Sequence, residues 1–152
     1  TGRREVQAEF VRVLDEGPGV LALSGAFDED NVLDAATDVF RGIIEAEKLS
    51  GTAAGDHFAA PGANDRVWNA LEKFAVADPD AFIRYYANDM LALISEAWLG
   101  PRYQVTSQLN QVNPGGKAQS PHRDFHLGFQ TMESAQGFPR HIHRMSAMLT
   151  LQ

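Results

Sequence analysis

The Gly100-Pro101 pair divides the chain into two halves with different hydrophobic periodicities. Before it, apolar residues recur every three or four positions, which is typical of amphipathic helices. After it, residues 102–113 alternate with a period of two, which is typical of a strand. A run of helices followed by a run of strands favours an α+β fold. We therefore predict a single domain in which residues 1–100 are mainly helical and residues 101–152 form strands.

The helical half contains several segments that are separated by turn signals. Asp28 and Asp78 are placed to act as N-caps, and Pro79 suits the first position of a helix. The predicted helices cover residues 5–16, the Asp28 cap through residue 47, residues 66–77 and residues 79–99. Apolar or alternating runs predict strands at 20–23, 102–113 and 145–151, and a stretch rich in Gly and Ala predicts a loop at 50–65.

The composition excludes several classes of protein. The 152 residues are 44% hydrophobic and 22% charged, which is ordinary for a globular domain. No apolar run approaches the roughly 20 residues of a membrane helix, so we expect no membrane-spanning segment. Cysteine is absent, which excludes disulfides, Cys-rich zinc sites, iron–sulfur clusters and a thiol nucleophile. This cysteine usage is compatible with a cytoplasmic location, which we expect.

The charge is distributed unevenly along the chain. The formal net charge of −7 disfavours nucleic acid and anionic membranes as partners. Residues 1–100 carry 8 basic and 18 acidic side chains, whereas residues 101–152 carry 5 basic and 2 acidic ones. Four of the five histidines also lie in the second stretch. A locally positive, histidine-rich segment in an acidic protein suggests a site for a small anion or a metal ion.

The last predicted strand, residues 145–151, runs to Gln152 without a turn or a polar tail. Two or three strands do not make an independently stable sheet with its own core. We therefore expect these 152 residues to be part of a longer protein whose further strands complete the sheet.

His122 and Asp124 are separated by a single residue, in a segment that follows a Pro-Gly-Gly turn. In an extended segment, residues two apart point the same way, so both side chains can face one metal ion. Two such ligands and a distant histidine form the 2-His-1-carboxylate triad of non-haem Fe(II) oxygenases. The triad leaves positions open for a 2-oxoacid and O₂. A surface histidine beside an aspartate is the alternative reading of this short motif.

Residues 110–124 resemble the metal-binding stretch of the phytanoyl-CoA dioxygenase family. In that family a polar strand leads to Pro-Gly and then to His-x-Asp followed by an aromatic residue, here Phe125. Residues 145–151 are similar to the next strand of the family. The resemblance is fairly specific over residues 108–151 and diffuse over residues 17–100.

The resemblance implies a double-stranded β-helix, a jelly-roll barrel with helices packed outside, that is incomplete in this segment. It implies His122 and Asp124 as ligands of Fe(II), with 2-oxoglutarate as cosubstrate. The implied reaction converts 2-oxoglutarate and O₂ to succinate and CO₂ while a small-molecule substrate is hydroxylated. Halogenating relatives replace the carboxylate ligand with a small residue, so the presence of Asp124 favours hydroxylation.

Three polar residues are candidates for binding the cosubstrate. Gln111 lies on a strand face shared with Leu109, and Gln119 precedes the first metal ligand by three positions. Ser146 matches a serine that contributes to 2-oxoglutarate binding in some members of the family. Alternatively, Gln111 is a strand amide whose hydrogen bonds are satisfied by its neighbours. Gln119 is then an ordinary loop side chain, and Ser146 an ordinary strand serine.

The sequence also departs from the family pattern. Members have a distal histidine ligand and an arginine that binds the 2-oxoglutarate carboxylate, and neither is found before Gln152. We therefore expect this segment by itself to be inactive. A non-catalytic or cupin-like module that binds a metal or a small molecule is the alternative function, and a helical adaptor with incidental histidines is a third.

Overall fold

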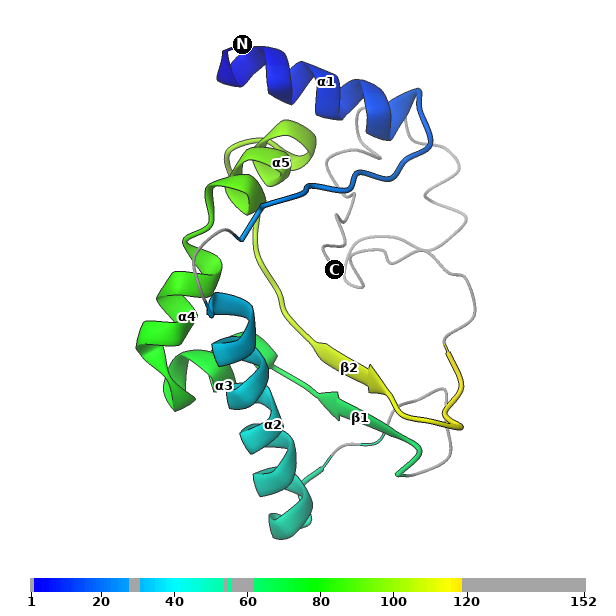
Figure 1. Cartoon of the computed structure of the whole chain (residues 1–152), viewed down its shortest axis with the longest axis vertical. Helices are drawn as coiled ribbons and strands as arrows, with labels where there is room; N and C mark the ends of the chain where they lie inside the picture. Colours follow the sequence, from blue (N-terminus) through cyan, green and yellow to red (C-terminus); the bar gives the residue numbers. More distant parts are fainter. Residues whose placement is uncertain (1, 28–30, 54, 56–61, 119–152) are drawn as a thin grey trace. The chain divides into compact units, whose positions relative to one another are not determined.

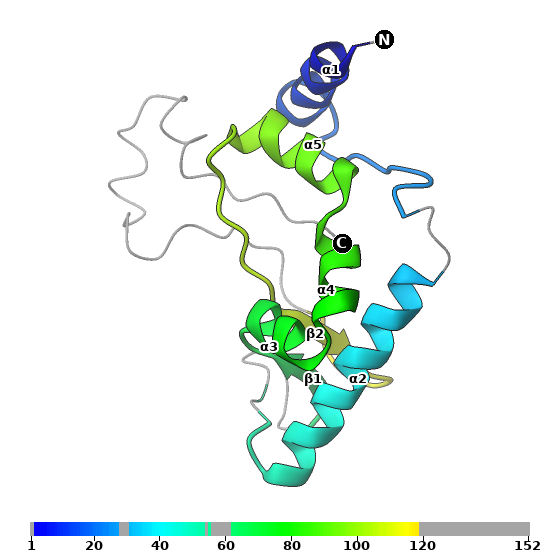
Figure 2. The ribbon, with the colours of Figure 1, turned by 90° about the vertical axis from the view of Figure 1, so that its left-hand side faces the viewer.

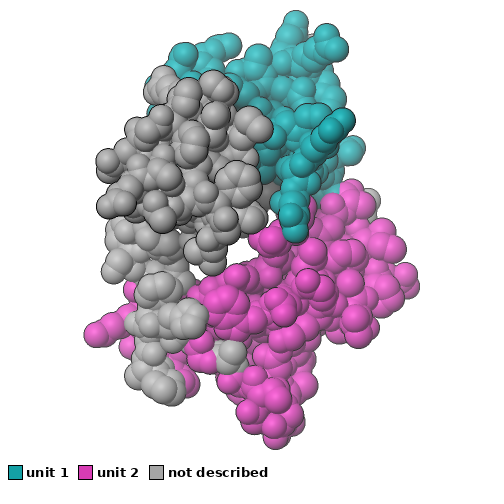
Figure 3. Space-filling view, turned by 180° about the vertical axis from the view of Figure 1, so that it is seen from behind, with its two compact units in different colours: residues 1–26, 88–104, 122–152 teal, residues 27–87, 105–121 magenta. Residues whose placement is uncertain are grey.

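The computed structural model describes residues 2–27, 31–53, 55 and 62–118 (Figure 1). These residues form two compact units, which Figure 3 colours separately. Unit 1 draws its described residues from 1–26 and 88–104, and unit 2 from 27–87 and 105–121. The described chain is mostly helical, with one two-stranded antiparallel sheet.

Unit 1 is built from α1 (Arg3–Asp15) and α5 (Asp89–Leu99), which pack against each other. Phe10, Leu93 and Ile94 form the buried cluster between these helices. An ion pair of 2.8 Å between the Arg3 guanidinium and the Glu96 carboxylate adds a polar contact at their surface. The helix predicted at 5–16 is therefore confirmed, with its start two residues earlier.

Residues 20–23 do not form the strand that the apolar run predicted. Leu21 and Leu23 instead pack on the cluster around Phe10. A strand needs a neighbouring backbone to complete its hydrogen-bond ladder. The described part of unit 1 is helical and offers side-chain contacts without a strand to pair with, so Leu21 and Leu23 are partly buried without joining a sheet.

The helix predicted over residues 79–99 is two helices, α4 (Pro79–Tyr86) and α5. The prediction was wrong because Asn88 acts as an N-cap inside the predicted helix. Its side-chain oxygen accepts hydrogen bonds from the backbone N–H groups of Met90 (2.9 Å) and Leu91 (3.0 Å). Its Nδ2 donates to the carbonyl of Ala26 at 2.6 Å. The side chain thus satisfies the first orphan donors of a new helix.

Unit 2 packs its helices around Phe74, which is fully buried. The rings of Phe40 and Phe82 lie 4.9 and 5.9 Å from the Phe74 ring, centroid to centroid. Asp78 caps α4 as predicted, because its carboxylate accepts from the Ala81 N–H at 2.9 Å and Pro79 follows it. The helices that surround Phe74 are α2 (Val32–Ser50), α3 (Ala70–Ala77) and α4, and Figure 2 shows them from a second side.

The second predicted helix begins at Val32, after Asn31 in a left-handed conformation, and ends at Ser50. Its predicted cap, Asp28, lies outside the described residues. Val32, Ala36 and Ile44 are the buried positions of its apolar stripe. Gly51, also left-handed, ends the helix, as glycine commonly does.

The sheet pairs β1 (Asn64–Val67) with β2 (Leu109–Val112), and Asp65 lies opposite Gln111. Two predictions were wrong here. Residues 66 and 67 belong to β1 rather than to a helix, so α3 starts later than predicted. Of the strand predicted over 102–113, only β2 is paired within the described residues, where β1 offers a ladder of four residues.

The jelly-roll barrel is not seen in the described residues, which hold the β1–β2 sheet alone. The strand predicted at 145–151 lies outside them. None of the helices in the described part of the chain is long and apolar enough to cross a bilayer.

Candidate functional site

One face of the β1–β2 sheet turns toward α2, and its character changes along the strands. Val67 and Leu109 are opposite each other and pack with Ile44 in an apolar cluster. Two pairs further along, Asp65 and Gln111 occupy the same face. On this face the sheet is therefore apolar at the Val67–Leu109 pair and polar at the Asp65–Gln111 pair. The polar side chains lie beside the apolar cluster, because residues two apart in a strand share a face.

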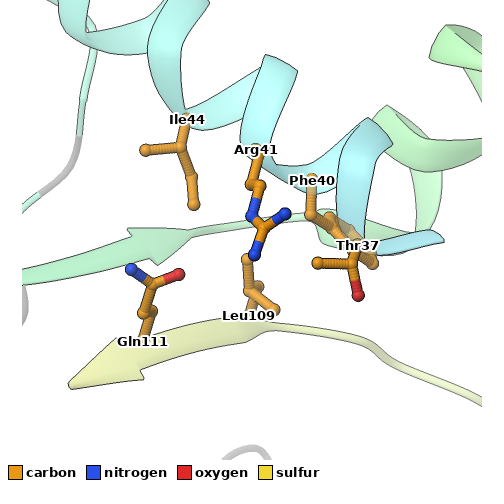
Figure 4. Close-up of a pocket in the computed structure, with 6 residues that line it drawn as sticks. All are labelled: Thr37, Phe40, Arg41, Ile44, Leu109 and Gln111. Atoms are coloured by element: carbon orange, nitrogen blue, oxygen red, sulfur yellow. The ribbon is translucent and has the colours of Figure 1, made fainter. Parts of the chain in front are cut away.

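A shallow pocket lies between this face and α2 (Figure 4). Its volume is about 80 Å³, which is smaller than the roughly 300–1,000 Å³ of typical ligand pockets. Arg41 and Gln111 approach it from opposite sides, and the Arg41 guanidinium lies 3.4 Å from the Asp38 carboxylate on α2. The pocket is lined by Thr37, Phe40, Arg41, Ile44, Leu109 and Gln111.

Gln111 is the first member of a chain of polar contacts. Its Nε2 donates to Oδ1 of Asn113 at 2.8 Å, and the Asn113 Nδ2 donates to the Asp65 carboxylate at 3.1 Å. The Lys48 ammonium from α2 lies 2.6 Å from the other oxygen of Asp65. The chain links α2, β1 and β2 through side chains that are far apart in sequence.

Asp65 is the buried centre of this chain, with a side chain only 9% exposed. Hydrogen bonding to Lys48 is the largest influence on it and lowers the pKa of the carboxyl group below its ordinary value. Burial opposes that shift, and the hydrogen bond from Asn113 adds to it. Asp65 is therefore a carboxylate that stays ionised because two donors face it.

Asn113 also begins the turn that ends β2. Its carbonyl accepts a hydrogen bond from the Gly116 N–H at 2.8 Å. Pro114 occupies the second position, and Gly115 has a φ of +84° at the third. This residue pattern and positive φ are those of a type II turn, in which glycine avoids a steric penalty. The Pro-Gly-Gly strand end predicted from the sequence is confirmed.

Asn64 holds the far end of the same turn. It is buried, and its Nδ2 donates to the carbonyl of Lys117 at 3.1 Å. A Cβ on Gly116 would collide with Oδ1 of Asn64 and lie 2.9 Å from the Asn113 carbonyl oxygen, so the Asn64 side chain or the turn would have to shift. Glycine at position 116 therefore allows the turn and β1 to approach closely.

On the opposite face of β1, the Arg66 guanidinium donates to the side-chain oxygen of Gln108. The guanidinium carbon also lies 4.1 Å from the centre of the Trp68 ring, in a cation–π contact. The contact with Gln108 links β1 to the residue just before β2, whereas the contact with Trp68 stays within the segment that follows β1.

Of the predicted site residues, the structure places only Gln111, and it places it at the pocket. Gln119, His122, Asp124 and Ser146 lie outside the described residues, so their roles stay predictions. Within the described segments, no group of three His, Cys, Asp or Glu side chains is arranged to hold a metal ion.

Sequence reasoning missed Asn64, Asp65 and Lys48. Asn64 and Asp65 fell in a predicted loop, because four strand residues are too few for a period of two to be recognised. The run from Asn64 to Val67 holds a single apolar residue, so the sequence carried no alternation that could have marked it as a strand. Nothing local pairs Lys48 with Asp65, since the fold alone brings them together.

The comparison with protein families completes this description. A model of the phytanoyl-CoA dioxygenase family matches residues 16–151, which is most of the chain and includes every predicted site residue. The chain belongs to the phytanoyl-CoA dioxygenase family. Members of the phytanoyl-CoA dioxygenase family are 2-oxoglutarate-dependent dioxygenases that typically use Fe(II). No curated protein and no solved structure matches the chain.

Proposed function

We propose that this member of the family is an Fe(II)- and 2-oxoglutarate-dependent oxygenase that hydroxylates a small-molecule substrate. The observation that carries the proposal is the His122-x-Asp124 motif inside the matched family domain. A neutral imidazole nitrogen and a carboxylate oxygen, two residues apart, form a donor set that suits Fe(II). The type II turn after β2 leads the chain into this motif.

His122 and Asp124 would hold the iron. When bound, Fe(II) supplies the activation of O₂ that couples decarboxylation of 2-oxoglutarate to hydroxylation of a substrate C–H bond. One 2-oxoglutarate, one O₂ and one substrate then give succinate, CO₂ and the hydroxylated product, so all atoms are accounted for. The presence of Asp124 favours hydroxylation over halogenation, because halogenating relatives carry a small residue in place of this carboxylate.

Gln111, Gln119 and Ser146 are proposed to contact the cosubstrate. Their amide and hydroxyl groups can donate hydrogen bonds to a carboxylate. Gln111 supports this role by its place at the pocket margin, where Asn113 holds its amide in one orientation.

We further propose that β1 and β2 belong to a jelly-roll barrel with helices outside. Two strands alone are marginally stable, so this sheet needs further strands or a packed helix. α2 already covers one face of the sheet around Leu109, as outer helices of such a barrel would. We propose O₂ and a small molecule as partners, and the net charge of −7 argues against nucleic acid.

The test is anaerobic titration of the whole protein with Fe(II) and 2-oxoglutarate, followed by a succinate assay in air. The expected result is a weak visible charge-transfer band and succinate formation. Asp124→Ala should remove the band and reduce succinate formation by at least about 100-fold. Loss of a group that only supports a metal ligand typically costs about 10- to 100-fold, and loss of the ligand itself should cost more. Glu133→Ala, an acidic residue of the same segment, is the matched control and should leave both unchanged.

Two outcomes separate the alternatives. Metal binding that Asp124→Ala abolishes, without succinate formation by the native protein, would contradict catalysis and support a metal-binding module. Absence of metal binding in the native protein would refute the iron site altogether.

A further inference from the structure

We propose that the pocket between α2 and β2 is a binding site for the carboxylate of a small aliphatic acid, with Arg41 as the residue that recognises the charge. The inference goes beyond the proposed function, because it requires neither iron nor turnover. All of the residues that line the pocket lie in unit 2 and within the described part of the chain.

The lining residues come from one face of α2 and one face of the sheet. Thr37, Arg41 and Ile44 are separated by four and three positions, so they lie on the same side of the helix. Leu109 and Gln111 are two apart on β2 and share the face that α2 covers. Figure 4 shows the Arg41 side chain extending from α2 toward the strands. A guanidinium and an amide from two different elements therefore border the same small space.

Arg41 is only loosely paired with its neighbour on the helix. Its guanidinium lies 3.4 Å from the Asp38 carboxylate, and both side chains are mostly exposed. Charge-assisted hydrogen bonds are usually about 2.7–2.9 Å long, and the Lys48–Asp65 pair is 2.6 Å. A guanidinium carries five N–H donors in a planar fork that matches a carboxylate. A carboxylate in the pocket can therefore bind Arg41 in two-point geometry by competing with a weak contact.

Gln111 offers the second donor to such an anion. Its amide nitrogen has two N–H groups, and Asn113 accepts one of them at 2.8 Å. The other N–H can donate to a carboxylate oxygen without disturbing that bond. The Thr37 hydroxyl donates to the Leu33 carbonyl at 2.8 Å, so it does not serve the anion. Arg41 and Gln111 are thus the two donors of the site.

The base of the pocket is apolar. Phe40, Ile44 and Leu109 pack in the cluster around the fully buried Val67. Apolar surface beside a charge lowers the local dielectric constant, so it strengthens the attraction between guanidinium and carboxylate. The volume of about 80 Å³ admits only a few non-hydrogen atoms, since one water molecule occupies about 30 Å³ in the liquid. The pocket therefore suits a carboxylate and the methylene groups next to it.

The experiment is a titration of the whole protein with butyrate, without metal and at low salt. Chemical shifts of the Arg41 Nε–H and of the Gln111 side-chain amide report binding at this pocket. We expect a dissociation constant of about 1–10 mM, which is ordinary for so small a ligand. Butanamide has the same shape without the charge, and it should bind at least about 10-fold more weakly.

Three variants test the assignment. Arg41→Gln should weaken butyrate binding by about 10-fold, because it removes the cation. Asp38→Asn should strengthen binding by about 2- to 5-fold, because it removes the competing carboxylate, a response that a purely structural role of Arg41 would not produce. Arg84→Gln is the matched control, since this exposed arginine of α4 does not line the pocket. It should bind butyrate as the native protein does.

The same titration with 2-oxoglutarate separates two sources of the carboxylate. Binding tighter than that of butyrate, and weakened by Arg41→Gln, would support the site and assign it to the cosubstrate. Weaker binding than that of butyrate would support the site and assign it to another acid.

No shift at Arg41 and Gln111 with butyrate, or equal affinities of native protein and Arg41→Gln, would overturn the carboxylate site. Equal binding of butyrate and butanamide would also overturn it. These results leave the iron site untouched because no metal is present. Failure of the native protein to bind Fe(II) would instead overturn the proposed function.

Discussion

Asp65→Asn is expected to destabilise the protein by about 2 kcal/mol at pH 7. The substitution keeps the shape of the side chain but removes its charge. Asp65 is the best position for such a test because its side chain is 9% exposed and has two donors, Lys48 at 2.6 Å and Asn113 at 3.1 Å. The effect therefore reports on the polar chain that joins α2 to the sheet.

The magnitude follows from the two contacts. Lys48 is 53% exposed, so solvent screens the ion pair and its loss costs about 1 kcal/mol, at the upper end for exposed pairs. The hydrogen bond from Asn113 weakens by roughly another 1 kcal/mol when its acceptor is no longer charged. Asp38→Asn is the control, because it removes a carboxylate from an exposed ion pair with Arg41 and should cost less than about 0.5 kcal/mol.

The pH dependence has a definite sign. The folded-state pKa of Asp65 is lowered, so its stabilisation is fully present above the unfolded value of about 3.9. That stabilisation is lost as the pH falls through the lowered pKa of the folded state. The free-energy difference between native protein and Asp65→Asn should therefore narrow on acidification from about pH 5 to pH 3.

Urea denaturation at pH 7, 5 and 3, followed by circular dichroism, measures these differences. Equal destabilisation by Asp65→Asn and Asp38→Asn at pH 7 would refute the argument that burial makes Asp65 special. A difference that stays constant down to pH 3 would refute the assignment of its effect to the charge of Asp65.

Two further predictions concern the core of unit 2 and the N-cap of α5. Phe74→Ala should lower the free energy of unfolding by about 3–5 kcal/mol in urea denaturation, because the ring is fully buried. Ile83→Ala, at an exposed position, should lower it by less than about 1 kcal/mol. Similar losses for both variants would contradict the assigned core. Asn88→Ala should lower stability by about 1–2 kcal/mol and reduce helical circular dichroism, because two N–H groups lose their cap. An unchanged spectrum and midpoint would show that the cap does not maintain the break before α5.

Features governed by local chemistry were predictable from the sequence. Asp78 and Pro79 start α4 because a carboxylate caps the N-terminus and proline suits its first position. Pro114 and Gly115 end β2 because their φ preferences are those of a type II turn. The family resemblance over residues 108–151 is confirmed by the match of the phytanoyl-CoA dioxygenase model.

Features that depend on distant partners were not predictable. Leu21 and Leu23 have the composition of a strand, but among the described residues they pack on the helices around Phe10 instead of pairing with a strand. The alternation that begins at residue 102 forms a ladder only where β1 faces it. The cap that Asn88 provides for α5 is local, because it binds Met90 and Leu91, and the sequence analysis missed it; only the hydrogen bond from Asn88 to Ala26 depends on a distant partner.

The sequence by itself therefore determined the family, the His122-x-Asp124 motif and the turn that leads to it, since each is written in consecutive residues. Only the tertiary structure decided that Asn64 and Asp65 hold the turn at both ends. These contacts join residues about fifty positions apart, and no local preference encodes such a pairing. The physical reason is that burial and hydrogen bonding act between neighbours in space, whereas turns and caps act between neighbours in sequence.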